Sequence, residues 1–136
     1  MIAKYNTQIN IDGKNYPIID AEAQKSLVYS QNETDTGKTW IDGKKIYRKV
    51  INCGVLPNNE EKNIPHNIKD YDTFLSIRAI AIYREAKSFI SLPFASQGNE
   101  SIKITVLGEN IVIGTYITRN YFKESYAILE YTKTTN

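Results

Sequence analysis

Runs of alternating apolar and polar residues, each ended by turn residues, constrain this sequence more than any other feature. In the segment 101–107, Ile102, Ile104 and Val106 alternate with polar residues, and 108–110 has the composition of a tight reversal. Strict alternation is typical of a strand with one buried face. The pattern predicts strands over 46–55, 63–68, 73–83, 88–92, 101–107, 110–117 and 125–132. Short strands separated by turns about every eight to twelve residues predict an antiparallel β-sandwich or a barrel.

The N-terminal part of the chain predicts a hairpin, a short helix and a linker. Apolar alternation flanks Asp12-Gly13, a pair that favours a type I′ hairpin turn, and the same pattern returns around Asp42-Gly43. Asp20 can cap a helix over 21–27, and the segment 30–38 contains no apolar residue, which is typical of a loop. We therefore divide the chain into an N-terminal segment (1–29), a linker (30–38) and a β domain (39–136).

The segment 73–83 is apolar on both of its faces. Leu75 and Ile77 lie on one face, whereas Phe74 and Ile80 lie on the other, around a single charge at Arg78. A strand buried on both faces belongs in the interior of a sheet. A helix is the competing interpretation because Ala and Leu are present, but the β-branched content favours a strand. We expect a central strand here.

Length, charge and cysteine content exclude several protein classes. The 136 residues suit one domain with one core. A net charge of +2 falls well short of the basic surface that phosphate binding requires, so nucleic acid is not an expected partner. The single Cys53 cannot form an intrachain disulfide. No apolar run approaches the roughly 18–20 residues that span a bilayer, and the start of the chain shows no secretory signal. We expect synthesis in the cytoplasm without membrane insertion.

No residue pattern predicts catalysis, a metal site or a cofactor. His66 is the only histidine, which excludes a two-histidine zinc site within one chain, and we interpret it mainly as a structural residue, with a ligand or interface role as the alternative. Cys53 lies in a strand-like run without an active-site motif, so we expect a buried thiol. The acid pairs Glu60-Glu61 and Asp70–Asp72 lie in polar turns, whereas glycosidases need two acids held roughly 5–9.5 Å apart.

Tyrosine is unusually frequent, with ten in 136 residues against four phenylalanines. Tyrosine rings fill the cores of β proteins, and they also provide rigid contact surface for ligands. The turn at Arg119 and Asn120 is surrounded by aromatic residues that we expect to be exposed. The predicted ligand-binding residues are Tyr116, Arg119, Asn120, Tyr121 and Phe122.

Four blocks of the sequence carry a family resemblance. They are Thr-Trp-Ile-Asp-Gly-Lys-Lys-Ile-Tyr-Arg-Lys (39–49), Gly-Val-Leu-Pro-Asn-Asn (54–59), Ile-Pro-His-Asn-Ile (64–68) and Leu-Glu-Tyr-Thr-Lys-Thr-Thr (129–135). Together they resemble the C-terminal head domain of tail-fibre or receptor-binding proteins from phages of Gram-positive bacteria. The first hairpin also looks like short segments of phage tail proteins. Lys45 and Asn67 depart from the family's pattern, which has Pro and Gly at these positions.

The resemblance implies a structural protein of a phage tail, in the fibre or the baseplate, that recognises the host. It implies a trimeric, jelly-roll-like, all-β head that binds a host cell-surface saccharide, and an N-terminal part that attaches to other tail proteins. It carries over no catalytic residue and no cofactor, and it implies a place in the virion. A purely structural tail or baseplate component, or a part of a tail-derived bacteriocin, is the alternative. A wall-degrading enzyme would need a cleft with two facing carboxylates.

Overall fold

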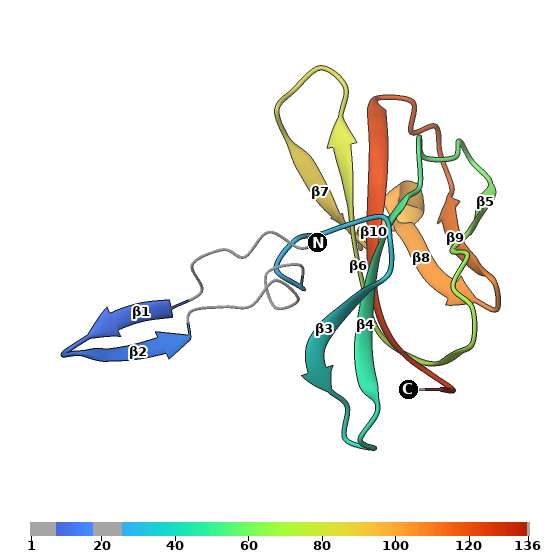
Figure 1. Cartoon of the computed structure of the whole chain (residues 1–136). Coiled ribbons are helices and arrows are strands. Elements are labelled where there is room, and N and C mark those ends of the chain that lie inside the picture. The colour runs from blue at the N-terminus through green and yellow to red at the C-terminus, as the bar shows by residue number, and fades with distance from the viewer. Residues whose placement is uncertain (1–7, 18–25, 136) are drawn as a thin grey trace.

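The computed structural model describes residues 8–17 and 26–135, and nearly all of their regular structure is β (Figure 1). The elements are β1 (Gln8–Ile11), β2 (Lys14–Pro17), β3 (Thr34–Thr39), β4 (Lys45–Asn52), β5 (Glu61–Pro65), β6 (Tyr71–Tyr83), β7 (Phe89–Leu92), the 3-10 helix η1 (Gly98–Glu100), β8 (Ile102–Leu107), β9 (Asn110–Thr115) and β10 (Phe122–Lys133). All described strand pairings are antiparallel. No helix among these residues is long and apolar enough to cross a membrane. The fold is therefore mostly β, as the alternating pattern predicts.

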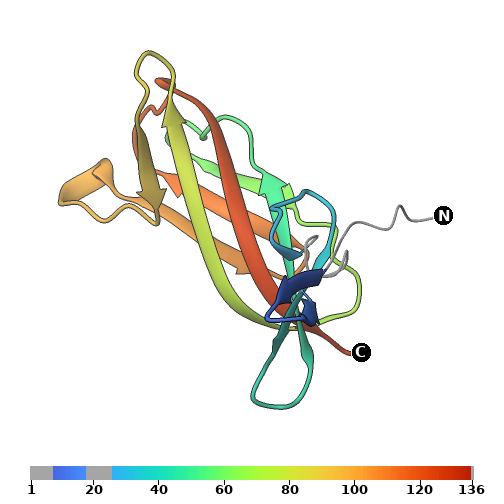
Figure 2. The same ribbon diagram turned by 60° about the vertical axis from the view of Figure 1, so that its left-hand side comes forward.

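The long strand β10 organises the larger of the two main sheets. This sheet has the strand order β3-β4-β10-β6-β7, and β10 pairs with β4 on one side and with β6 on the other. The smaller sheet has the order β5-β9-β8. Figure 2 shows the smaller sheet as a second layer behind β6 and β10. The two layers form a β-sandwich, whereas β1 and β2 pair only with each other.

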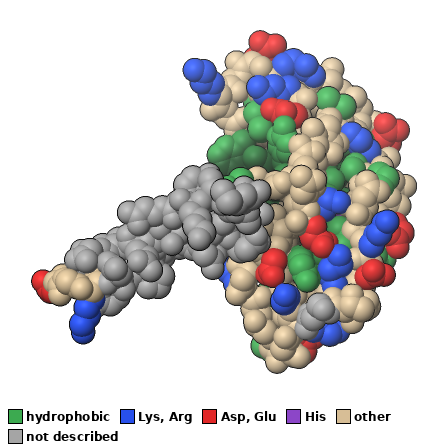
Figure 3. Space-filling view, in the orientation of Figure 1, with side chains coloured by type: hydrophobic (Ala, Val, Ile, Leu, Met, Phe, Trp, Pro, Cys, Tyr) green, Lys and Arg blue, Asp and Glu red, His purple; other side chains and the backbone are tan. Residues whose placement is uncertain are grey.

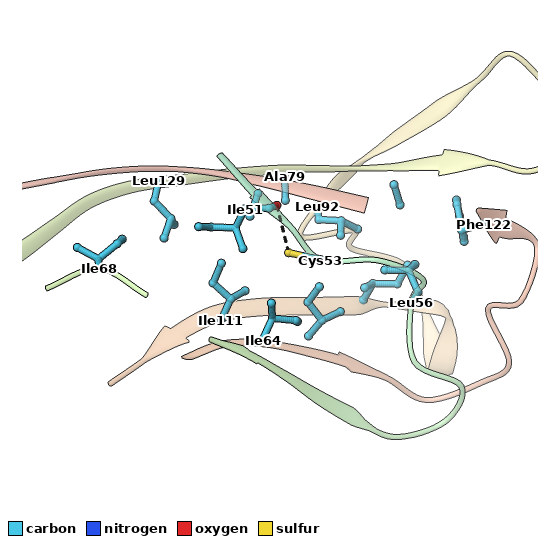
Figure 4. Packing of buried hydrophobic residues seen from close by; sticks show 14 of the residues in the cluster. Ile51, Cys53, Leu56, Ile64, Ile68, Ala79, Leu92, Ile111, Phe122 and Leu129 are labelled. Atoms are coloured by element: carbon cyan, nitrogen blue, oxygen red, sulfur yellow. Dashed lines mark hydrogen bonds between the residues drawn. The ribbon is translucent and has the colours of Figure 1, made fainter. Parts of the chain in front are cut away.

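The hydrophobic core lies between the two main sheets. Ala127 in β10 pairs with Ile51 in β4 and with Ala79 in β6, so all three lie on the same face of the larger sheet. Figure 4 shows Ile51 and its neighbours facing Ile111 of the smaller sheet. Burying an Ile or Leu side chain contributes roughly 1.5–3 kcal/mol. The other buried members are Cys53, Leu56, Ile64, Ile68, Ala81, Leu92, Ile102, Ile113, Phe122, Leu129 and Tyr131.

Two predicted hairpins are present, with different turns. Asp12 and Gly13 have φ values of 52° and 77°, and two consecutive residues with positive φ are what a type I′ turn requires. The second hairpin joins β3 to β4 through residues 40–44, where the Gly43 N–H donates to the Trp40 carbonyl. Both hairpin predictions are confirmed, although the second turn is longer than the first.

The predicted central strand is also confirmed. β6 lies between β10 and β7, with Ala79 and Ala81 buried on the inner face. Ile80 and Ile82 are half-buried on the outer face. Over residues 79–83 both faces of β6 are therefore buried or half-buried, whereas the exposed positions of the strand carry the polar residues Asp72, Thr73, Ser76 and Arg78.

The segment predicted as a linker is partly a strand. Thr34–Thr39 forms β3, which pairs with β4 at the edge of the larger sheet. The linker prediction was wrong for 34–38 because an edge strand with exposed side chains needs no apolar residue. This strand is anchored by polar contacts, since the buried Tyr131 donates its hydroxyl to Glu33 at 2.6 Å. Residues 21–25 of the predicted helix lie outside the described residues.

Candidate functional site

One end of the sandwich gathers the connections that carry the predicted ligand-binding residues. Here β4, β6 and β9 end while β5, β7 and β10 begin, so the connections 53–60, 84–88 and 116–121 lie together at the upper end in Figure 1. Hydrogen bonds join these connections, because the Arg84 N–H donates to the Tyr121 carbonyl and the Asn59 N–H donates to the Ile117 carbonyl. We call this region, with η1 and the start of β8, the open end.

A shallow pocket lies at the open end, between η1, β8 and the residue that follows β9. Its volume is about 420 Å³, within the usual range for small-ligand sites. The lining residues are Gly98, Asn99, Ser101, Lys103 and Tyr116. The pairing of Ile102 with Thr115 brings the two sides of the pocket together.

The pocket combines an aromatic face with polar groups. The Tyr116 ring is 46% exposed, and the Lys103 Nζ lies 5.4 Å from its centroid, which is within cation–π range. The hydrogen bond with Tyr116 raises the pKa of Lys103 above its usual value. Ser101 is engaged internally, since its Oγ donates to the Ser96 carbonyl at 2.9 Å. The Asn99 amide and the N–H groups of Lys103 that are not directed at Tyr116 are therefore the polar groups that a ligand can use.

The structure separates the five predicted ligand-binding residues into two groups. Tyr116 and Asn120 are exposed, and Tyr121 is 40% exposed while its ring stacks on Tyr83 at 6.0 Å. Arg119 and Phe122, in contrast, are 6% and 0% exposed. The expectation that Phe122 is exposed was wrong, because β10 begins at Phe122 and its ring enters the core.

The sequence-based prediction missed the four pocket residues that the fold brings to Tyr116, which are Gly98, Asn99, Ser101 and Lys103. Gly98 and Asn99 lie in a polar segment that has no periodic pattern, and η1 could not be predicted from it. Lys103 belongs to a predicted strand and was assigned only to the outward face. The one sequence feature that could have indicated Lys103 is its place on the polar face of a predicted strand that precedes the aromatic turn at 116–122.

The other end of the sandwich, formed by residues 66–74 and 108–109, is filled by its own side chains. His66 is fully buried. Its Nδ1 accepts a hydrogen bond from the Ile68 N–H at 3.1 Å, so its Nε2 carries the proton and donates to the Gly108 carbonyl at 2.8 Å. The Tyr71 and Phe74 rings both lie 5.3 Å from the imidazole, edge to face. We call this region the closed end, because both His66 nitrogens are used within the protein.

Burial of Cys53 and an ion pair at Asp72 account for two other groups that the sequence analysis considered for catalysis. Cys53 is buried, and burial raises the pKa of its thiol to about 11, so it is not a nucleophile at neutral pH. Asp72 forms an ion pair with Lys44 on the surface. The described residues contain no group of three or more His, Cys, Asp or Glu side chains that could hold a metal ion.

Comparison with known proteins identifies no relative of this chain. Neither a family model, nor a curated protein sequence, nor a solved structure matches this chain. The pocket at the open end and the four sequence blocks at 39–49, 54–59, 64–68 and 129–135 are therefore the features that bear on function.

Proposed function

We propose that this protein is a host-recognition module of a phage tail and that its β-sandwich binds a cell-wall saccharide at the open end. The observation that carries the proposal is the exposed Tyr116 ring in a pocket with Asn99 and Lys103. A sugar ring has an apolar face that packs on an aromatic side chain, and it has hydroxyl groups that amide and ammonium groups bind. Few polar groups around an apolar surface are the usual composition of a small-ligand site.

The proposal extends to assembly and location. The resemblance to phage receptor-binding heads supports a jelly-roll-like head that forms a homotrimer and an N-terminal segment that attaches to other tail proteins. The protein then acts in the virion, without an enzymatic activity or a cofactor. Because a homotrimer presents three sites, weak binding to one saccharide is strengthened by multivalency.

Binding to isolated cell walls tests the saccharide site. Fluorescently labelled protein is mixed with purified walls from a panel of Gram-positive bacteria, and the bound fraction is measured after sedimentation. We expect Tyr116→Ala to weaken binding at least about tenfold, which corresponds to roughly 1.4 kcal/mol. The matched control is Tyr29→Ala, which removes a ring that is 54% exposed on the outer face of the larger sheet. Wild-type protein that binds no wall in the panel, or equal losses in both variants, would overturn the saccharide site.

Size exclusion with light scattering tests the trimer. Three chains of 15.5 kDa give about 46 kDa. A constant mass of one chain over a wide concentration range contradicts the trimer.

A second candidate function, a purely structural tail or baseplate component, is favoured by the outer face of the larger sheet. Hydrophobic side chains gather on the face that carries β6 and β7 in Figure 3. Phe89 in β7 is 61% exposed, and Leu27 and Val28 are 69% and 61% exposed. Exposed apolar groups of this kind are typical of protein contacts. This candidate predicts that the wild-type protein binds no wall.

A further inference from the structure

Arg119 is a charged side chain that the fold buries without a counter-ion among the described residues. It is 6% exposed, and the ion pairs that the described residues form all involve lysines. Glu100 lies beside it, but the Glu100 carboxylate accepts a hydrogen bond from the Ser96 hydroxyl at 3.2 Å instead. Burying an unpaired charge is costly unless hydrogen bonds compensate for it. The hydrogen bonds of the Arg119 guanidinium must therefore compensate for its burial, and their partners indicate the role of the residue.

The guanidinium donates hydrogen bonds in two directions. Its Nη1 donates to the Tyr121 hydroxyl, and its Nη2 donates to the backbone carbonyl of Glu100. The backbone N–H of Arg119 donates to the Asn58 Oδ1, which fixes the residue against the β4–β5 connection. Its Nε has no hydrogen-bond partner among residues 8–17 and 26–135. Arg119 thus joins three connections of the open end.

These contacts link the two sides of the pocket. Glu100 is the last residue of η1, which contributes Gly98 and Asn99 to one side. Tyr116, on the other side, lies in the same β9–β10 connection as Arg119. Arg119 therefore contacts both of the segments that line the pocket.

The turn that contains η1 has few other attachments. The Ser96 N–H donates to the Ser101 Oγ at 3.1 Å, so this bond closes the turn on itself. At its base, Phe94 and Ile102 exchange a pair of backbone hydrogen bonds. Among the side-chain hydrogen bonds of the described residues, the bond from Arg119 to Glu100 connects residues 95–101 to the β9–β10 connection, next to the ladder pairing of Ile102 with Thr115.

We propose that Arg119 is a positioning residue of the saccharide pocket, which holds η1 against the β9–β10 connection and so keeps Asn99 at the right distance from Tyr116. This inference rests on the proposed function for its ligand, whereas the bridge itself can be tested without one. The planar guanidinium donates in two directions at once, and a lysine ammonium at the end of a flexible stem does not reproduce this geometry.

Amide hydrogen exchange and wall binding together test the bridge. Exchange of the Ser96 and Ile102 amides is followed by NMR in the wild type, in Arg119→Lys and in Tyr121→Phe. Arg119→Lys keeps the charge but loses the two-sided contact, so we expect about tenfold faster exchange of the Ser96 amide and about tenfold weaker binding to walls. Tyr121→Phe removes one acceptor and keeps the exposed ring, so we expect about two- to threefold changes in the same direction.

The control is His66→Gln at the closed end, which lowers global stability but leaves the bridge intact. We expect it to leave Ser96 exchange and wall binding within about twofold of the wild type. Unchanged Ser96 exchange in Arg119→Lys, or equal acceleration in His66→Gln, would overturn the bridge. If Arg119→Lys does not fold, unchanged exchange in Tyr121→Phe overturns it. Faster exchange in a protein that binds no wall supports the bridge and overturns the proposed ligand.

Discussion

The two ends of the sandwich use polar and aromatic side chains in opposite ways. At the closed end, both His66 nitrogens are bonded to backbone groups, and the imidazole is enclosed by the Tyr71 and Phe74 rings. At the open end, the Tyr116 ring and the Asn99 side chain face solvent in a pocket. A polar group that is fully satisfied inside the protein stabilises one conformation and has nothing left for a ligand. Exposed groups that converge on a pocket contribute little to stability and are available for binding.

The first and largest expected effect is at the closed end. His66→Gln removes the ring that packs between Tyr71 and Phe74, and an amide cannot meet both the Ile68 N–H and the Gly108 carbonyl in the same place. We expect a loss of about 2–3 kcal/mol in the free energy of unfolding, from unsatisfied backbone groups and a partly empty site. Urea unfolding at pH 7 measures it. A loss below about 0.5 kcal/mol, typical of a surface substitution, would contradict the distinction between the two ends.

A second effect comes from the core between the two ends and depends on pH. Burial raises the pKa of Cys53 from 9.0 to about 11. Because the folded state disfavours the thiolate, this stabilisation is fully present below pH 9 and is lost as the pH rises through about 11. At pH 10, one unit above the ordinary pKa of the thiol, the free energy of unfolding has fallen by about 1.4 kcal/mol because of this group. Between pH 8 and 10, we expect the free energy of unfolding, measured with urea, to decrease less in Cys53→Ala than in the wild type, by about the same 1.4 kcal/mol. Identical pH profiles would show that the thiol does not titrate as its burial requires.

The sequence predicts best those features that depend on residues close together in the chain. Asp12-Gly13 supports positive φ at two consecutive positions, and the alternation in β8 assigns its buried face without any knowledge of the partner strands. β3 was missed because its residues are polar and exposed, and only pairing with β4 makes them a strand. Local sequence signals do not record a pairing of this kind.

In the candidate site, too, local sequence patterns do not predict which individual residues are exposed. Tyr121 and Phe122 are adjacent aromatic residues, yet one is 40% exposed and the other is fully buried. Neighbours on a strand point to opposite faces, and the sheet that packs on β10 decides which of them is enclosed. The pairing of β8 with β9 brings the segments of Asn99 and Tyr116 together, so no local pattern could have placed Asn99 in the pocket.

The smallest expected effect on stability is at the open end. There we expect a substitution to change ligand binding and to leave stability almost unchanged, the opposite of what we expect for His66→Gln. Asn99→Ala removes an exposed amide from η1, so we expect the free energy of unfolding to change by less than about 0.5 kcal/mol. If the pocket binds a saccharide, the same variant should bind isolated walls about three- to tenfold more weakly, since a ligand hydroxyl loses its partner. Urea unfolding and wall sedimentation on one preparation give both values. A side chain that serves only to bind a ligand contributes little to the stability of the fold. If Asn99→Ala instead lowers the free energy of unfolding as much as His66→Gln does and leaves wall binding unchanged, the side chains of the open end have a structural role like those of the closed end.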